Sequence, residues 1–251
     1  MNIRVADLPP ATDAPLLISV VTVVYNGISS LEQTIQSVLG QSWKNFEYLL
    51  IDGGSTDGTA DLVKKYGSQF KYWISEPDKG IYDAMNKALK VATGDFLIFI
   101  NAGDTFFSPH TLKEFVQLSP DREKVYYGDA KYTDPIHKTE YFRGGYFSKY
   151  RLSKTNICHQ TIFYSRKAYQ NNSYSLKYPV FADWAYNIRL FKSCGFTWIN
   201  QTIANYDLRG FSAETRDVRF ERDQKLLFLR FLGFDSLLYI LFKKIAPVWT
   251  V

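Results

Sequence analysis

The chain has 251 residues, a formal net charge of +5 at pH 7 and a pI near 9.0. Aromatic residues make up 17% of it, which excludes a disordered chain and favours a core with surfaces that stack on flat ligands or sugar faces. The positive charge suits an anionic partner, such as phosphate groups or an acidic membrane face. Because the basic residues are scattered and no nucleic-acid motif occurs, nucleic acid is not an expected partner.

The cysteines and the ends of the sequence bear on the compartment. Cys158 and Cys194 form no CxxC or Cys/His cluster, which predicts neither a disulfide framework nor a zinc site and favours a reducing cytosol. Residues 1–15 lack the apolar core of a signal peptide and are interpreted as an N-terminal tail. No uninterrupted apolar run of about 20 residues occurs, so we predict no membrane-spanning helix.

Three apolar runs in the first half predict parallel strands. They cover residues 16–26, 46–51 and 96–100, with helical patterns between them. Nearly continuous apolar runs that alternate with helices indicate an α/β fold whose mostly parallel sheet is flanked by helices on both faces. Ligands of such sheets collect at the carboxyl ends of the strands, where Asp52 and Asp104 fall. The sequence therefore predicts a nucleotide site at this edge.

The elements between and after these runs divide the chain into two halves. A helix is expected to begin at Ser30, whose hydroxyl can cap it. Further helices are expected from residues 56–59 to about 66, over 81–92 and over 183–191, and further strands over 72–75, 125–132, 162–164, 196–199 and 203–206. Residues 142–155 show only weak periodicity. We expect residues 16–120 to bind the nucleotide and residues 121–215 to shape the site of the other substrate.

Residues 216–251 are expected to form a C-terminal amphipathic helical segment. Its stretch 226–244 is strongly apolar but interrupted by Arg230 and Asp235, and it ends in two lysines. Such a segment suits a membrane interface, with its basic end on anionic lipid. The alternative is a helix packed on the domain or a contact between copies of the chain, and the oligomeric state stays open.

Two aspartates are the first candidates for chemistry. Asp52, followed by two glycines, can accept from a nucleobase imino N–H, or the Asp-Gly-Gly sequence simply makes the turn. Asp104 is the candidate ligand for Mg²⁺ or Mn²⁺, which take oxygen ligands and share carboxylates with substrate phosphates. A helix or turn cap is the alternative for Asp104. No GxGxxG follows the first strand and no GxxxxGK[ST] occurs, so Rossmann and P-loop chemistry lose support.

The motifs of residues 19–104 resemble those of the nucleotide-binding half of family 2 glycosyltransferases with the GT-A fold. The matching pieces are Val23-Val24-Tyr25-Asn26, Gln41-Ser42-Trp43, Asp52-Gly53-Gly54-Ser55-Thr56-Asp57-Gly58-Thr59, Ala92-Thr93-Gly94-Asp95 and Asn101-Ala102-Gly103-Asp104. The run of residues 76–87, with His159-Gln160 later, is similar to a bacterial subgroup that builds exopolysaccharide, capsule and O-antigen repeats. Past Asp104 the match is looser.

This resemblance implies a nucleotide-sugar donor, usually a UDP-sugar, and Mg²⁺ or Mn²⁺ as cofactor. The residues implied to bind the nucleotide are Val23, Tyr25 and Asp52 at the base, Lys79, Asp83 and Asn86 at the ribose and diphosphate, Asn101, and Arg209 in a loop that closes over the donor. Asp104 would be the remaining acid of the DxD element and would hold the metal. Asn101 stands at the first acid position of that element, and Gly103 at the middle one. An exposed loop arginine is the alternative for Arg209.

Asp183 is the implied catalytic base. The sequence Phe181-Ala182-Asp183-Trp184 matches the place where the family has an acid that opens a helix. A sugar hydroxyl is a poor nucleophile near neutral pH, so an aligned carboxylate must take its proton as the new bond forms. An N-cap is the alternative role for Asp183. His159 is expected to contact the acceptor, with a structural histidine as the alternative.

These features predict a metal-dependent, inverting hexosyl- or N-acetylhexosaminyl-transferase. It would move a sugar from a nucleotide-diphosphate donor to a hydroxyl of a lipid-linked glycan in bacterial surface polysaccharide synthesis, at the inner face of the cytoplasmic membrane. A sugar-1-phosphate nucleotidyltransferase is an alternative, although residues 25–28 do not supply the Gly-rich loop that it needs. A non-catalytic glycan-binding or scaffold protein is another, given the reduced DxD element.

Overall fold

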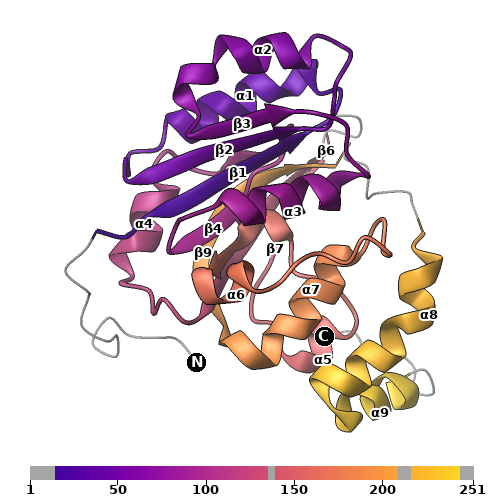
Figure 1. Cartoon of the computed structure of the whole chain (residues 1–251). Helices are drawn as coiled ribbons and strands as arrows, with labels where there is room; N and C mark the ends of the chain where they lie inside the picture. Colours follow the sequence, from indigo (N-terminus) through magenta and orange to yellow (C-terminus); the bar gives the residue numbers. More distant parts are fainter. Residues whose placement is uncertain (1–14, 135–138, 209–215, 244–251) are drawn as a thin grey trace.

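The computed structural model describes residues 15–134, 139–208 and 216–243. Its strands form one mixed nine-stranded sheet in the order β3-β2-β1-β4-β8-β6-β9-β5, and β7 pairs with β6. Helices lie on both faces of this curled sheet (Figure 1). The α/β fold predicted from the alternating apolar runs is therefore confirmed.

The first half supplies the parallel part of the sheet. Its elements are β1 (Ile18–Val24), α1 (Ile28–Leu39), β2 (Phe46–Asp52), α2 (Thr59–Lys65), η2 (Gly67–Gln69), β3 (Tyr72–Ser75), α3 (Ile81–Val91), β4 (Phe96–Phe99), β5 (Thr105–Phe106) and α4 (Thr111–Gln117). Strand β1 pairs in parallel with β2 and β4, and every residue of β1 and β4 is buried. Because the three strands run in one direction, their carboxyl ends meet at one edge.

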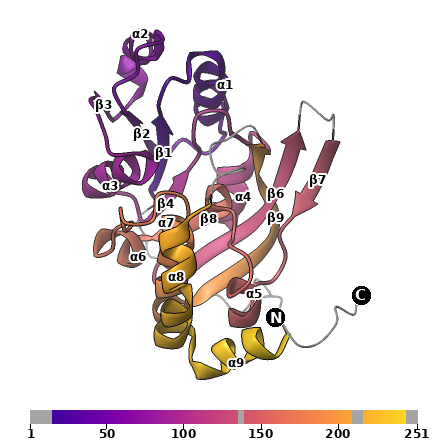
Figure 2. The ribbon, with the colours of Figure 1, turned by 90° about the vertical axis from the view of Figure 1, so that its right-hand side faces the viewer.

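The second half extends the sheet with antiparallel and mixed pairings. Its elements are β6 (Val125–Asp134), β7 (Thr139–Arg143), α5 (Lys149–Leu152), η3 (His159–Thr161), β8 (Ile162–Ser165), α6 (Arg166–Gln170), α7 (Ala182–Leu190), η4 (Phe191–Gly195), β9 (Phe196–Asp207), α8 (Val218–Leu227), η6 (Phe228–Leu232) and α9 (Phe234–Lys243). Strand β8 joins the halves because it is antiparallel to both β4 and β6. Figure 2 shows β6, β7 and β9 side by side.

The core has two parts, one on each face of the sheet. Alternate residues of β1 point to opposite faces, so Val21 and Val23 join one cluster while Val20 and Val24 join the other. The first cluster includes side chains of α3 and α7, and the second includes side chains of α1 and α4. Helices on both faces thus explain why these strands are continuously apolar.

The structure corrects two expectations about local structure and assigns elements to a segment for which none was predicted. Helix α1 begins at Ile28, two residues before Ser30, with Gly27 at the N-cap position, so the predicted Ser30 cap is wrong. The weakly periodic residues 142–155 include the end of β7 and helix α5. The two short strands expected over 196–199 and 203–206 are one strand, β9. It pairs with β6 through register shifts around Asp129, which explains the broken apolar pattern.

The described residues of the C-terminal segment form α8, η6 and α9, with Gly233 outside the helical conformation between η6 and α9. Helix α8 packs on α7 through Phe220, whose ring lies 5.0 Å from the Trp184 ring and 5.5 Å from the Phe181 ring. Across the described ranges, no helix is both long enough and apolar enough to cross a membrane.

Candidate active site

The carboxyl end of β2 holds the first predicted site residue, Asp52. Its side chain is fully buried, and its two oxygens accept from the hydroxyls of Ser55 and Ser75, each at 2.5 Å. Tyr25 follows β1, the strand beside β2, and is 66% exposed, whereas Val23 is buried in the core. The carboxylate is thus held by two neutral donors, and an exposed aromatic ring follows the adjacent strand.

The turn after β4 holds Asp104, the predicted metal ligand. Its carboxylate is 5% exposed and accepts from Gln160 Nε2 at 2.7 Å and from the backbone N–H of Asp207 at 3.1 Å. Burial raises the pKa of Asp104 to about 7, and these two hydrogen bonds only partly offset it. Gly103 adopts φ +102°, a backbone conformation that is unfavourable for residues with a Cβ atom. Glycine at this position therefore lets the turn close.

Asp183 lies in the first turn of α7, where the sequence places it. Its carboxylate is 8% exposed. Oδ1 accepts from the Tyr82 hydroxyl at 3.0 Å and from the backbone N–H of Trp184 at 2.8 Å, and Oδ2 accepts from Asn156 Nδ2 at 2.7 Å. These three donors fix the orientation of the Asp183 carboxylate.

His159 connects the two acidic centres. Its Nδ1 lies 3.4 Å from Asp183 Oδ2, and its Nε2 lies 2.8 Å from Asn101 Nδ2. With its proton on Nδ1, the side nearer Asp183, the ring can accept from Asn101 Nδ2 at Nε2. Asn101 belongs to the same turn as Asp104, whose backbone N–H donates to the Asn101 carbonyl at 2.9 Å. Asp183, His159, Asn101 and Asp104 therefore form one site.

The remaining predicted nucleotide residues lie around α3. Lys79 is exposed, and its backbone N–H donates to Asp83 Oδ2 at 3.1 Å. Both ends of the Asn86 amide bond to the backbone of Tyr174, at 2.8 and 2.9 Å, so this side chain ties α3 to the second half of the chain. Arg209 lies outside the described residues.

The fit of a divalent cation can be judged from Asn101 and Asp104. Among the described residues, the buried Oδ1 atom of Asn101 has no hydrogen-bond partner. It belongs to the same turn as the Asp104 carboxylate, whose pKa is raised by burial. Oxygen ligands of this kind suit Mg²⁺ or Mn²⁺. Within the described part of the chain, no three His, Cys, Asp or Glu side chains cluster to hold a metal, so further ligands would have to come from substrate phosphates.

Three side chains with clear contacts in this site received no role from the sequence. They are Tyr82 and Asn156, which donate to Asp183, and Gln160, which donates to Asp104. Gln160 follows His159 directly, so the short turn η3 contacts both acidic centres. Adjacency to His159 was a usable signal for Gln160, whereas nothing in the local pattern distinguishes Asn156.

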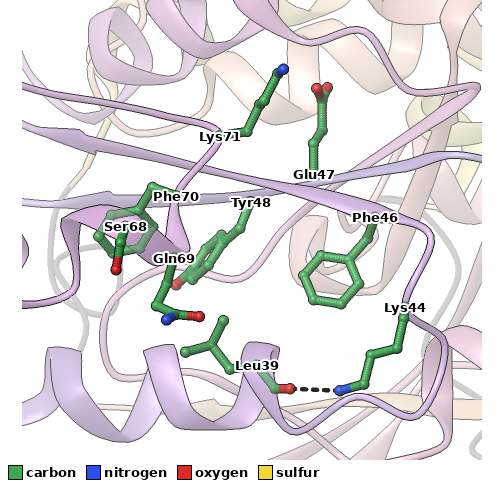
Figure 3. A pocket seen from close by; sticks show the side chains of 9 residues that line it. All are labelled: Leu39, Lys44, Phe46, Glu47, Tyr48, Ser68, Gln69, Phe70 and Lys71. Carbon is green, nitrogen blue, oxygen red and sulfur yellow. Dashed lines mark hydrogen bonds between the residues drawn. The ribbon is translucent and has the colours of Figure 1, made fainter.

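A surface hollow of about 440 Å³ lies elsewhere, at the amino ends of β2 and β3. Figure 3 shows its lining of Leu39, Lys44, Phe46, Glu47, Tyr48, Ser68, Gln69, Phe70 and Lys71, with Lys44 Nζ donating to the Leu39 carbonyl at 3.1 Å. Phe46 begins β2 and Asp52 ends it, so about 20 Å of strand separates this hollow from the site. The hollow is not part of the candidate active site.

Comparisons with known proteins agree with this geometry. The family model "Glycosyl transferase family 2" matches residues 19–195. A PGL/p-HBAD biosynthesis glycosyltransferase of Mycobacterium tuberculosis is 34% identical over 210 residues, which cover 80% of each chain. An uncharacterized glycosyltransferase of the same species is 30% identical over 204 residues, covering 79% of this chain and 78% of the relative.

Two solved structures share the fold. Staphylococcus aureus TarS (residues 1–349), in complex with UDP-GlcNAc, matches with a TM-score of 0.65 at 19% identity, over 85% of this chain and 67% of TarS. The mannosyltransferase PcManGT from Pyrobaculum calidifontis, in complex with GDP-Man and Mn²⁺, matches with a TM-score of 0.60 at 14% identity, over 96% and 68%. Together with the family match, they show that the chain belongs to glycosyl transferase family 2 and is a glycosyltransferase with the GT-A fold.

Proposed function

We propose that the protein transfers a sugar from a UDP-sugar to a hydroxyl of a glycan acceptor, with inversion at the anomeric carbon. The proposal rests on one observation. Contacts through His159 and Asn101 join Asp183 and Asp104 into one site at the carboxyl edge of the sheet. A proton acceptor and a diphosphate-binding turn are the two groups that such a transfer needs. Family membership does not favour a sugar-1-phosphate nucleotidyltransferase or a scaffold.

In this proposal Asp183 takes the proton of the acceptor hydroxyl. The acceptor oxygen then bonds to the anomeric carbon while the bond to the nucleoside diphosphate breaks, and a single displacement of this kind inverts the centre. Tyr82, Asn156 and His159 hold the carboxylate so that one orientation is presented to the acceptor. Mg²⁺ or Mn²⁺, when bound by Asp104 and Asn101 Oδ1, would neutralise charge on the departing diphosphate.

The donor base is proposed to be uracil, in contact with Asp52, Tyr25 and Val23. The complexes of TarS with UDP and UDP-GlcNAc support this choice, and the GDP-Man complex of PcManGT makes guanine the competing base. Ser55 and Ser75 each donate to one oxygen of Asp52, whose side chain is fully buried, so the loop around Asp52 has to open before a base N–H can reach it. Lys79, Asp83, Asn86 and Arg209 remain proposals for the ribose and diphosphate.

Nucleotide titration tests this donor assignment. Purified protein would be titrated calorimetrically with UDP, GDP, CMP and dTDP, each with and without Mn²⁺. We expect tight, metal-dependent binding of UDP and weak binding of the others. Tight binding of GDP instead would keep the transferase and reject uracil. If no nucleotide binds, the proposed function itself is rejected.

The acceptor is proposed to be lipid-linked and reached from the cytoplasmic face of the membrane. Leu226, Leu229 and Phe234 in the C-terminal helices are 67%, 42% and 62% exposed. Lys225 and Arg230 are exposed beside them, and this combination of apolar and basic side chains suits an anionic lipid surface.

Vesicle sedimentation tests the membrane contact. The wild-type protein should co-sediment with vesicles containing phosphatidylglycerol, and the double variant Leu226→Glu/Leu229→Glu should remain in the supernatant. Tyr72→Glu, at a 37% exposed tyrosine of β3, is the matched control and should sediment as the wild type does. Equal sedimentation of the double variant would reject the membrane contact and leave the transferase proposal intact.

A further inference from the structure

Three tyrosines form a row across strands β7, β6 and β9. Tyr132 of β6 lies directly opposite Tyr141 of β7 on one side and Tyr206 of β9 on the other. The rings of Tyr132 and Tyr141 stack with centroids 5.1 Å apart and an interplanar angle of 5°. The rings of Tyr132 and Tyr206 are 5.0 Å apart. Figure 2 shows these three strands at one side of the molecule.

The inner part of this tyrosine row adjoins the candidate active site. Tyr132 lies beside Cys158, the residue before His159. A narrow hollow is lined by Tyr132, Cys158 and Asn156, among others, and Asn156 donates to Asp183. A continuous path of contacts therefore runs from the aromatic rings to the proposed base.

The outer end of the row is open to water. Tyr132 is 9% exposed, whereas Tyr141 is 45% exposed although one of its faces stacks on Tyr132. All five residues of β7 are exposed, so this strand gains little from the core. Packing between the strands would stabilise the hairpin. That packing does not explain why the large ring of Tyr141, beside the candidate active site, remains exposed to water.

The chemistry of such a surface matches a carbohydrate. One face of a pyranose ring presents mainly C–H groups, which pack against the electron-rich face of an aromatic ring. Tyrosine adds rigid contact area at small conformational cost and a hydroxyl for a sugar hydroxyl. Neighbouring rings along a row suit successive sugars of a chain better than they suit a single small molecule.

We propose that Tyr141, Tyr132 and Tyr206 form a distal subsite for the acceptor glycan, which binds a sugar ring behind the one that carries the accepting hydroxyl. The inference rests on the proposed function, because it takes the accepting hydroxyl to lie at Asp183. The subsite is remote from the reacting atoms, so it contributes to binding of the acceptor in the ground state and the transition state alike. Its loss should raise the acceptor KM and leave kcat unchanged.

Two variants and one matched control test the subsite. Tyr141→Ala removes the exposed ring, and Tyr141→Trp keeps an aromatic face at the same place. Phe142→Ala removes the neighbouring ring, which is 61% exposed and, as the next residue of the strand, lies on the opposite face of the sheet. Thermal unfolding of each variant checks that the hairpin remains folded.

The first measurement uses an array of immobilised mono- to tetrasaccharides with UDP present. We expect wild-type binding to increase with the second or third sugar ring, and Tyr141→Ala to weaken it about three- to tenfold, the range for one aromatic contact. Tyr141→Trp and Phe142→Ala should bind as the wild type does. Absence of saccharide binding, no gain with length, or equal losses in Tyr141→Ala and Phe142→Ala would overturn the subsite.

A second measurement separates the subsite from the proposed function. With a saccharide that binds the array, transfer kinetics should show a raised acceptor KM and an unchanged kcat for Tyr141→Ala. An unchanged KM together with normal turnover would reject the subsite and keep the transferase. Length-dependent glycan binding without any UDP binding or sugar transfer would keep the subsite and reject the proposed function.

Discussion

The two halves of the site are built in different ways. In the first half, Asp52 and the Asn101–Asp104 turn follow parallel strands directly, and a close neighbour in sequence, Ser55, holds the Asp52 carboxylate. In the second half, His159, Gln160 and Asp183 reach the site from a short turn and a helix start. Their partners come from far along the chain, up to 101 residues away for Tyr82 and Asp183. The backbone position of the site residues thus follows from strand ends in the first half and from tertiary contacts in the second, although Gln160 and Asp207 of the second half also hold the Asp104 carboxylate.

The largest expected effect is that of Asp183→Asn. The amide keeps the volume of the side chain but cannot take the proton of the acceptor hydroxyl, so we expect transfer to fall by about 10² to 10⁴. UDP binding should be unchanged, because Asp183 lies in the acceptor half. Steady-state transfer kinetics and calorimetric titration with UDP measure the two effects separately.

Asp129→Asn is a suitable control for this change. Asp129 also accepts hydrogen bonds in the second half, from the backbone N–H of Gly145 and from Trp198 Nε1, and it contacts neither acidic centre. It should keep most of the turnover of the wild type. If Asp183→Asn and Asp129→Asn had the same turnover, Asp183 would not be the base.

The contact between the halves is tested by Gln160→Leu. The change removes the amide that donates to Asp104 and leaves His159 in place. Loss of a group that orients a metal ligand commonly costs 10- to 100-fold in metal affinity. We expect a loss of about that size in Mn²⁺ affinity with UDP present, measured from the electron paramagnetic resonance signal of free Mn²⁺.

A second buried glutamine provides the comparison for Gln160. Gln41 is 1% exposed, and its amide bonds to Ser108 and Leu112 in the first half, away from both acidic centres. Gln41→Leu should lower thermal stability and leave Mn²⁺ affinity unchanged. Equal Mn²⁺ affinities in both variants would show that Gln160 does not orient a metal ligand.

The same contrast explains what could be predicted from the sequence. Apolar runs predict strands that are buried on both faces, and a carboxylate directly after such a run lies at the carboxyl edge of the sheet. Asp52 and Asp104 were therefore placed correctly at strand ends. Asp183 was found by its motif at a helix start. Gln160 and Asn156 received no role because their partners, Asp104 and Asp183, are 56 and 27 residues away. Local patterns do not identify such distant partners, and the one local signal for Gln160 was its position beside His159.

Asp104→Asn tests whether the ionised, buried carboxylate of Asp104 destabilises the folded protein. The folded pKa of Asp104, about 7, exceeds the ordinary value of 3.8, so the folded state binds a proton more tightly than the unfolded state does. Ionising this carboxylate therefore destabilises the fold as pH rises from about 4 to 7. In EDTA at pH 8, Asp104→Asn should unfold a few degrees higher than the wild type.

The pH dependence supplies the control for this measurement. At pH 4 the carboxyl is largely protonated in the folded protein and about half protonated when unfolded, so the two Tm values should approach each other. A variant that is less stable than the wild type at pH 8 would mean that the bonds from Gln160 and Asp207 outweigh the cost of burial. It would also remove the reason for expecting a cation there.

The smallest expected effect concerns the start of α1. The two candidate caps there are Ser30, from the helix itself, and Asp57, from a distant loop. The Ile28 N–H donates to Asp57 Oδ2 at 3.0 Å, so the loop after β2 satisfies a donor at the observed start of the helix, two residues before the predicted Ser30 cap. Loss of a capping side chain typically costs roughly 0.5 to 2 kcal/mol, and the low end applies at this exposed position. Asp57→Ala should therefore lower the free energy of unfolding measurably in urea titrations, and Ser30→Ala should change it by less than about 0.5 kcal/mol. A larger loss in Ser30→Ala would restore the local cap, and the contrast between locally and distantly built parts would not extend to this helix.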